Sequence, residues 1–116
     1  MKIRVKRGEI YMADLDTVRG SEQGGIRPVL IIQNDKGNEY SPTTVVLPLT
    51  TKIYKSAVMP THVILKDIEG LDEISASMAE QIRTIDKGRL IKYIGTVPKR
   101  TMNTAIRRTI KTELGI

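Results

Sequence analysis

Short apolar or β-branched runs, each ended by a turn signal, fill most of this 116-residue chain and restrict what it can fold into. Glycine, proline, asparagine and aspartate stand between the runs, so the backbone is expected to reverse direction several times. A series of short strands separated by turns is typical of small antiparallel sheets and barrels. The expected strands are residues 9–15, 26–34, 43–51, 61–65, 75–82 and 90–97.

Two prolines inside the expected strands constrain where those strands lie, because proline cannot donate a backbone hydrogen bond. Pro28 stands near the start of its strand, where a missing N–H group is tolerable. Pro48 stands inside residues 43–51 and predicts an edge strand or a bulge there. Polar segments join the strands, and the expected loops and turns are residues 16–25, 35–38, 52–60, 67–73 and 86–88.

The C-terminal tail has the periodicity of an amphipathic helix. Met102, Ile106 and Ile110 recur at spacings of four residues and define one face. Pro98 suits the first turn of such a helix, and Gly115 suits its end. The same face is completed by Ala105, Thr109 and Leu114.

These patterns predict a mainly β (α+β) fold, a small antiparallel β-barrel with a C-terminal helix. A two-layer α+β sheet is the alternative that the same elements leave open. The length fits a single domain, residues 1–116. Because Phe and Trp are absent, the core is expected to consist of Ile, Val, Leu, Met and Ala, with help from the four tyrosines.

The absence of cysteine excludes a disulfide framework and a thiolate metal site, and it suits a reducing cytoplasm. The basic N-terminus is not followed by the apolar run of a signal peptide. No stretch of about 18 apolar residues occurs, so the chain is not expected to span a membrane. We therefore expect a cytoplasmic protein.

The net charge of +6 is unevenly distributed. The first ten residues carry +3 and the last thirty carry +7, whereas the segment between them carries −4. Basic ends favour an anionic partner, of which RNA or DNA is the simplest. Ordinary solubility is the alternative explanation of the same charge.

Residues 20–35 contain the strongest functional signal, because a glycine-rich turn leads directly into a buried strand with Arg27 at the junction. Gly24 and Gly25 carry no Cβ, so backbone N–H groups beside them can approach a ligand closely. A guanidinium next to such a turn suits a phosphate, which accepts forked hydrogen bonds. The segment predicts a phosphate-binding site.

Several strings in this chain resemble the MazF/PemK family of bacterial toxins. They read KRGEIY at residues 6–11, GSEQGGIRPV at 20–29, QND at 33–35 and EQIRTIDK at 80–87. The resemblance covers roughly residues 4–95, and the second and fourth strings are the most specific. The helical tail is similar in type more than in sequence.

The resemblance implies a single toxin domain with an SH3-like barrel, which forms a homodimer and cleaves single-stranded RNA at specific sequences. It also implies that no metal or cofactor takes part, and that a cognate antitoxin covers the RNA groove. Cleavage without a metal uses the 2′-OH as the nucleophile and leaves a 2′,3′-cyclic phosphate and a 5′-OH. The single histidine excludes a two-histidine mechanism within one subunit.

Arg27 and Thr50 correspond to the two catalytic residues of the family. Charge stabilisation and proton donation suit Arg27, because a pKa above about 12 leaves almost no neutral form to act as a base. Glu22 is the candidate carboxylate, either to orient Arg27 or to accept the 2′-OH proton. The alternatives are a salt bridge from Arg27 to Glu22 or Asp35, and a packing role for Thr50.

The candidate RNA contacts surround the same turn. Gln81 is predicted to read a base edge, or else to be a strand amide that faces solvent. Tyr11 is predicted to stack on a base or to pack in the core, two roles that the sequence leaves open. His62 has no metal-ligand companion and is expected to be structural. The turn itself supplies Ser21, Gln23, Gly24 and Gly25.

Two other functions fit parts of the sequence. A non-enzymatic gyrase poison of the same fold needs a tryptophan before its Gly-Ile ending, but Leu114 stands there. The intact Gly-Gly-x-Arg turn also weighs against a gyrase poison. A non-catalytic RNA-binding barrel is the third alternative, and Arg27→Ala separates it, because such a barrel has no cleavage to lose. The sequence therefore predicts a ribonuclease, whose cleavage motif depends on the loops at residues 16–24 and 52–60.

Overall fold

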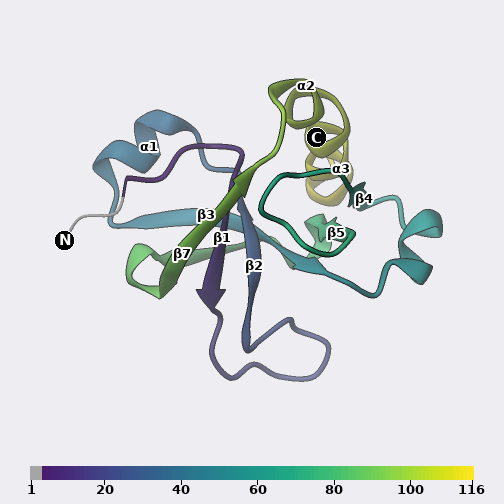
Figure 1. Cartoon of the computed structure of the whole chain (residues 1–116), viewed down its shortest axis with the longest axis horizontal. Coiled ribbons are helices and arrows are strands. Elements are labelled where there is room, and N and C mark those ends of the chain that lie inside the picture. The colour runs from purple at the N-terminus through teal and green to yellow at the C-terminus, as the bar shows by residue number, and fades with distance from the viewer. Residues whose placement is uncertain (1–3) are drawn as a thin grey trace.

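The computed structural model describes residues 4–116, so the first three residues of the basic N-terminal segment lie outside the described part of the chain. Residues 4–116 form a seven-stranded antiparallel sheet with the order β4-β5-β3-β2-β1-β7, and β6 pairs with β3 (Figure 1). The predicted mainly β fold with a C-terminal helix is confirmed. The strands are β1 (Glu9–Asp14), β2 (Ile26–Ile31), β3 (Thr43–Thr50), β4 (His62–Leu65), β5 (Ser75–Met78), β6 (Arg83–Asp86) and β7 (Leu90–Thr96).

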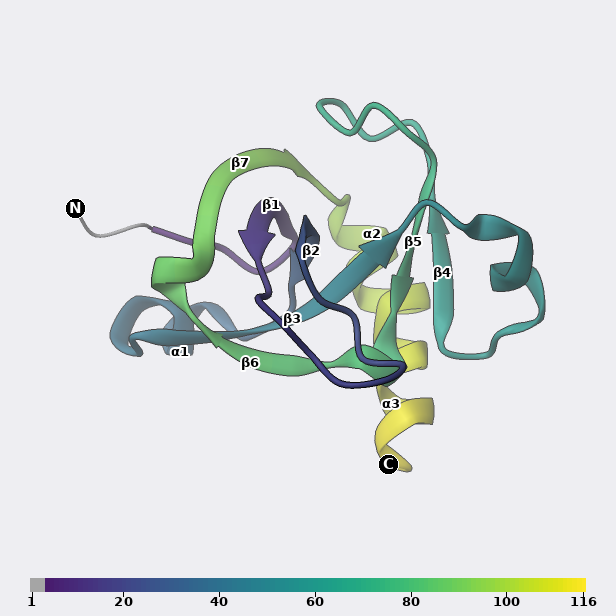
Figure 2. The same ribbon diagram turned by 90° about the horizontal axis from the view of Figure 1, so that it is seen from below.

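Strand β3 joins the two parts of this sheet. Its first half, residues 43–46, pairs with β6, and its end at Leu49 and Thr50 pairs with β5. Irregular register between β1 and β7 increases the local twist, and Figure 2 shows β7 arching over β1. The sheet therefore curls into a barrel-like shape, with α1 at one end of β3 and the C-terminal helix near the other (Figures 1 and 2).

Pro48 does not lie on an edge strand, because β3 has partners on both sides. It lies between Val46, the last residue paired with β6, and Leu49, the first paired with β5. The prediction of an edge was therefore wrong, and the alternative prediction of a bulge is not met either, because Pro48 pairs in regular register with Val29 of β2. A proline without an N–H group fits the position at which the strand exchanges one neighbour for another.

Two further segments differ from the prediction. Residues 35–38 are not a simple turn but begin helix α1 (Asp35–Tyr40), whose N-cap Asn34 accepts the Gly37 N–H at 2.8 Å. Residues 75–82 are not one strand: β5 ends at Met78, and a 3-10 turn, η2 (Ala79–Gln81), redirects the chain into β6. The sequence prediction missed this turn, because it took residues 75–82 as one continuous strand.

Short helical turns also occupy segments expected to be loops, namely η1 (Ile53–Val58) and η3 (Lys87–Arg89). The C-terminal helix is confirmed, as α2 (Lys99–Thr101), a π-helical segment η4 (Met102–Ile106) and α3 (Arg107–Leu114). Gly115 ends it in the left-handed conformation, with φ 70°. Among the helices of the described residues, none has the length and apolar character that crossing a membrane requires.

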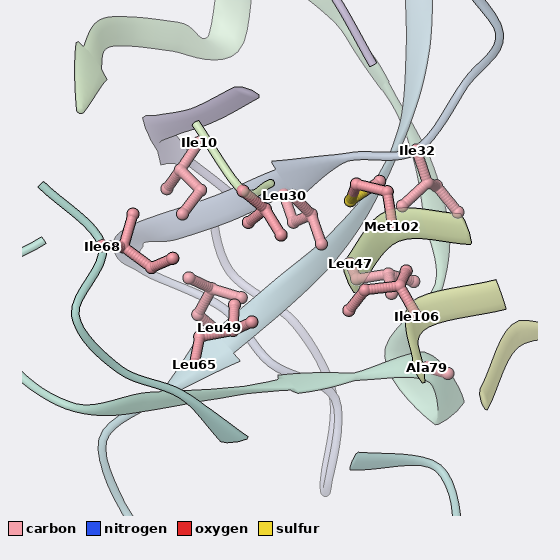
Figure 3. Packing of buried hydrophobic residues seen from close by; sticks show 11 residues of the cluster. Ile10, Leu30, Ile32, Leu47, Leu49, Leu65, Ile68, Ala79, Met102 and Ile106 are labelled. Carbon is pink, nitrogen blue, oxygen red and sulfur yellow. The ribbon is translucent and has the colours of Figure 1, made fainter. Parts of the chain in front are cut away.

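The hydrophobic core lies on both faces of the sheet, because side chains alternate along each strand. One cluster packs beneath the C-terminal helix and includes Ile10, Leu30, Leu47 and Ile106 (Figure 3). The other cluster lies on the opposite face and contains Tyr11 with aliphatic residues of β1, β2, β3 and β6. The predicted aliphatic core is confirmed, although Leu114 is 51% exposed in the last helical turn, which projects beyond the sheet (Figure 2).

Ser77 offers a test of this packing. Its hydroxyl lies in the core with no hydrogen-bond partner among the described residues, whereas the equally buried Ser75 donates to the Glu73 carbonyl at 3.0 Å. We expect Ser77→Ala to leave stability unchanged or raise it by up to about 1 kcal/mol, and Ser75→Ala to lower it by a similar amount. Thermal unfolding of both variants measures the contrast, and an equal loss in both would contradict this reading of Ser77.

Candidate active site

The register of β2 against β3 brings Arg27 and Thr50 together. Val29 lies opposite Pro48, Leu30 opposite Leu47 and Ile31 opposite Val46. The recorded pairing ends at Val29, and the same antiparallel register extended by two residues would set Arg27 opposite Thr50. A direct contact supports this proximity, because Arg27 Nη1 donates to the carbonyl of Leu49, the residue before Thr50, at 3.4 Å. On the extended register, the two residues assigned to catalysis by resemblance would project from the same face of the sheet, although they are far apart in the sequence.

Arg27 is oriented by two backbone carbonyls. Its Nε donates to the Gly24 carbonyl at 3.0 Å, and its Nη1 donates to the Leu49 carbonyl at 3.4 Å. A guanidinium carries five N–H groups, so the remaining donors of Nη1 and Nη2 have no partner among the described residues. The side chain is half-buried. These two bonds hold the positively charged guanidinium, with its remaining N–H donors, beside the end of β3, where Thr50 lies.

The alternative ion pairs for Arg27 are not formed in the described residues. Glu22 is exposed, and its Oε1 accepts the backbone N–H of Arg19 at 2.8 Å. Asp35 instead accepts the backbone N–H of Arg7 at 2.7 Å. The positive charge of Arg27 is therefore available to an anionic ligand, and Glu22 lies in the same loop without a recorded contact to Arg27.

The Thr50 hydroxyl is held as a donor. Its oxygen accepts the backbone N–H of Lys52 at 3.1 Å. A hydroxyl whose oxygen accepts one bond still has its own proton to donate. Thr50 can therefore donate to an oxygen placed between it and Arg27.

The loop between β1 and β2 approaches these residues through a narrow neck. Leu15 N–H donates to the Gly25 carbonyl at 2.9 Å, and Gly25 N–H donates to the Asp16 carbonyl at 3.0 Å. Gly25 has φ 72°, which favours glycine. A Cβ on Gly24 would lie 2.7 Å from both the Asp16 carbonyl oxygen and the Val18 side chain. Both glycines are therefore required by the loop conformation itself.

Gln81 connects this loop to the turn η2. Its Oε1 accepts the backbone N–H of Gln23 at 3.1 Å, and its Nε2 donates to the Ser21 carbonyl at 3.3 Å. Figure 2 shows the loop reaching the junction of β5 and β6, where η2 lies. Gln81 is therefore not a strand amide. Direct contacts thus link Arg27, Gly24, Gln23, Ser21 and Gln81, and Arg27 also reaches the Leu49 carbonyl beside Thr50.

Tyr11 does not belong to this group. It is 6% exposed, its ring packs edge-to-face against Tyr93 at 5.8 Å, and its hydroxyl bonds to Glu9. Burial and the neighbouring Glu9 carboxylate raise the pKa of Tyr11 to about 12. Of the two roles left open for Tyr11, the structure has core packing. The expectation of base stacking is corrected, because a buried ring has no free face to offer.

A second polar cluster lies behind η2. His62 contacts Glu80 through Nε2 at 2.7 Å and Ser56 through Nδ1 at 3.0 Å, and Thr61 donates to Glu80 at 2.7 Å. The His62 side chain is 8% exposed, which agrees with the expected structural role. Partial burial raises the pKa of Glu80, but hydrogen bonds from His62 and Thr61 outweigh it, so this pKa lies below its usual value.

The lowered pKa of Glu80 predicts a pH-dependent contribution to stability. A carboxyl with a depressed folded-state pKa stabilises above its unfolded pKa, and this contribution is lost as the pH falls through the folded pKa. We expect Glu80→Gln to lower the melting temperature at pH 7, and this difference should shrink as the pH falls through the folded-state pKa of Glu80. Melting curves from pH 3 to 7 test this, and a pH-independent difference would contradict it.

Sequence reasoning missed Arg83, which has no motif of its own beyond the matched string. Its Nη1 donates to the Leu15 carbonyl at 3.3 Å, beside the neck of the loop. Nothing in the sequence indicated a cleft of about 370 Å³, which is lined by Met12, Pro28, Asp72 and Tyr93 among other residues.

This cleft lies on the face of β2 opposite to Arg27, because the side chains of Pro28 and Arg27 point to opposite faces of the strand. No group of three His, Asp or Glu in residues 4–116 could hold a metal ion.

Known proteins share this fold and much of this sequence. A family model described as the PemK-like, MazF-like toxin of type II toxin-antitoxin systems matches residues 6–113. Endoribonuclease MazF of Staphylococcus saprophyticus is 51% identical over 88% of this chain and 88% of its own. A mycobacterial endoribonuclease, solved with its cognate antitoxin, is 31% identical with a TM-score of 0.74 and covers 97% of this chain and 95% of its own.

MazF of Deinococcus radiodurans has a TM-score of 0.82 at 21% identity, covers 98% of this chain and 99% of its own, and is a likeness of fold alone. The fold and the family model together define a small antiparallel-barrel toxin. The chain belongs to the family of PemK-like, MazF-like toxins of type II toxin–antitoxin systems.

Proposed function

We propose that this toxin is a sequence-specific endoribonuclease that cleaves single-stranded RNA without a metal ion. The observation that carries the proposal is the Arg27 guanidinium, which is bonded to the Gly24 and Leu49 carbonyls beside Thr50 and keeps N–H donors without a partner among the described residues. The Thr50 hydroxyl, which accepts from Lys52 N–H, keeps its own proton to donate. The 51% identity to a MazF endoribonuclease supports the same activity. Arg27 and Thr50 together suit a phosphodiester, which offers two non-bridging oxygens to such donors.

Cleavage begins with attack of the ribose 2′-oxygen on the adjacent phosphorus. The O2′–P bond forms, the P–O5′ bond breaks, and the products carry a 2′,3′-cyclic phosphate and a 5′-OH. Arg27 stabilises the charge that develops on the phosphoryl oxygens and donates a proton to the leaving 5′-oxygen, and it regains a proton from solvent after cleavage. Thr50 donates to one of these oxygens or to the leaving oxygen. Glu22 is the candidate carboxylate to accept the 2′-OH proton.

The other contacts follow from the same loop. Ser21, Gln23, Gly24 and Gly25 are proposed to line the path of the RNA. Only those of their backbone groups that are not already bonded within the protein would contact phosphate or base edges. We further propose that residues 1–116 are one toxin domain, that the chain forms a homodimer, and that a cognate antitoxin inhibits it in the cytoplasm. The relative solved with its cognate antitoxin supports that partner.

The decisive experiment is cleavage of a long unstructured RNA by the purified protein in excess EDTA, with the product ends mapped. Discrete cuts that carry 2′,3′-cyclic phosphate are expected, and the sequences around them give the cleavage motif. Absence of cuts with EDTA and with added Mg²⁺ would refute the ribonuclease. Cuts that need added Mg²⁺, or that leave 3′-OH ends, would refute the metal-free mechanism.

Thr50→Val separates chemistry from packing at the second catalytic position. Valine has the shape of threonine without the hydroxyl, so the strand is retained. We expect kcat to fall by about 10- to 100-fold with little change in KM, because one transition-state hydrogen bond is lost. Single-turnover cleavage measures this, and Thr43→Val on the same strand is the matched control. Equal rates in the Thr50→Val and wild-type proteins would leave Thr50 with a packing role.

A further inference from the structure

The tip of the loop between β1 and β2 is bonded to the Gln81 side chain, whereas Arg83 and Arg89 contact the start of the loop at Leu15 and Asp16. Gln81 accepts from Gln23 N–H at 3.1 Å with Oε1 and donates to the Ser21 carbonyl at 3.3 Å with Nε2. These bonds flank Glu22 on both sides and use both ends of the amide. They cross 58 and 60 residues of sequence, so they fix the loop to a separate part of the fold.

The same loop contacts the guanidinium of Arg27. Gly24 directly follows Gln23, and its carbonyl accepts from Arg27 Nε at 3.0 Å. A loop that moves away from Gln81 carries this carbonyl with it. Arg27 would then keep only its longer contact to the Leu49 carbonyl, at 3.4 Å. The orientation of the guanidinium therefore depends on the position of the loop.

Gln81 is itself anchored through the residue before it. The Glu80 carboxylate is bonded at 2.7 Å to both His62 and Thr61, and His62 is bonded in turn to Ser56 at 3.0 Å. These residues belong to β4, its preceding turn and η1, so three segments hold η2 in place. A polar network whose members are all bonded is rigid, and this one is partly buried.

We propose that Gln81, anchored by the Glu80–His62 pair, is a positioning residue that clamps the β1–β2 loop and thereby orients Arg27. It acts through Gln23 and Gly24 and does not need to touch RNA. The inference deepens the proposed ribonuclease function and rests on it for its effect on catalysis. The clamp itself is a property of the folded chain and is measurable without any substrate.

The first measurement is amide hydrogen exchange at Gln23, because its N–H donates to Gln81. Gln81→Ala is expected to speed this exchange about tenfold or more, since the protected state is lost. Gln33→Ala is the matched control: the Gln33 amide donates at 3.1 Å to Asn38 and to the Thr43 carbonyl, on another part of the fold. Unchanged exchange at Gln23 in Gln81→Ala would overturn the clamp.

The second measurement is the kinetic effect of the same two variants. We expect Gln81→Ala to lower kcat about tenfold with KM and the cleavage motif unchanged, and Gln33→Ala to leave kcat unaltered. In an Arg27→Ala background, Gln81→Ala should have no further effect, because residues that act through one another are not additive. A changed motif would make Gln81 a base reader, and full additivity would overturn action through Arg27.

The anchor is tested by Glu80→Gln, which keeps the shape of the side chain and removes its charge. Faster exchange at Gln23 is expected, with no added effect when it is combined with Gln81→Ala. If the wild-type protein cleaves no RNA, only the proposed ribonuclease function is refuted. The hydrogen-exchange experiment still decides whether the clamp exists. Unaltered exchange at Gln23 in Glu80→Gln would remove the anchor from the proposal.

Discussion

Arg27→Ala is expected to lower the cleavage rate by about 10³-fold, the largest effect on activity of any single substitution in this chain. The guanidinium lies beside the end of β3, and the Gly24 and Leu49 carbonyls already orient its free donors. Removing it leaves the developing phosphoryl charge without a partner. Single-turnover rates on an RNA that contains the mapped cleavage motif measure the loss.

Arg27→Lys distinguishes a fork of donors from a simple positive charge. Lysine keeps the charge but cannot bond two carbonyls and a phosphate in one plane, so we expect about 10²-fold loss. Arg100→Ala removes an exposed arginine of α2 and should leave the rate within about twofold. A wild-type rate in Arg27→Lys would show that charge alone is sufficient and that the orienting carbonyls have no catalytic role.

The sequence predicts the parts of this site that are encoded in short strings. The glycine-rich turn and Arg27 are adjacent in the chain, so their proximity needs no knowledge of the fold. Thr50 was assigned by resemblance, and the register of β2 against β3 supplies the physical reason. Alternation along strands also separates Arg27 from Pro28, which lines a cleft on the other face.

Contacts between distant segments could not be predicted in this way. The sequence pattern predicts Gln81 to be a strand residue, whereas in the structure the turn η2 directs it toward the β1–β2 loop. This turn forms because the chain leaves β5 and pairs, as β6, with another part of β3. Tyr11 was open to two roles for the same reason, since its exposure depends on how β7 packs against β1. Each difference arises from tertiary contacts that override local pattern.

Gly70→Ala is expected to cause the largest loss of stability of any loop substitution. Gly70 lies in the acidic loop between β4 and β5 with φ 91°, and a Cβ there would lie 1.9 Å from the Ile94 carbonyl oxygen. The approach is mutual, because a Cβ on Gly95 would lie 2.3 Å from the Glu69 carbonyl oxygen. Neither neighbour is a flexible side chain, so the loop would have to move away from β7.

That movement uncovers Ile68, which is 8% exposed and belongs to the core beneath the C-terminal helix (Figure 3). The left-handed backbone and the lost burial together cost about 3 kcal/mol, which lowers the melting temperature by roughly 10 °C. Gly20→Ala is the matched control, because Gly20 has φ 54° and no atom within 4 Å of its added Cβ. It should lose only the backbone part, about 1 kcal/mol. Equal melting temperatures for the two variants would mean that the loop relaxes freely and that its contact with β7 contributes nothing to the fold.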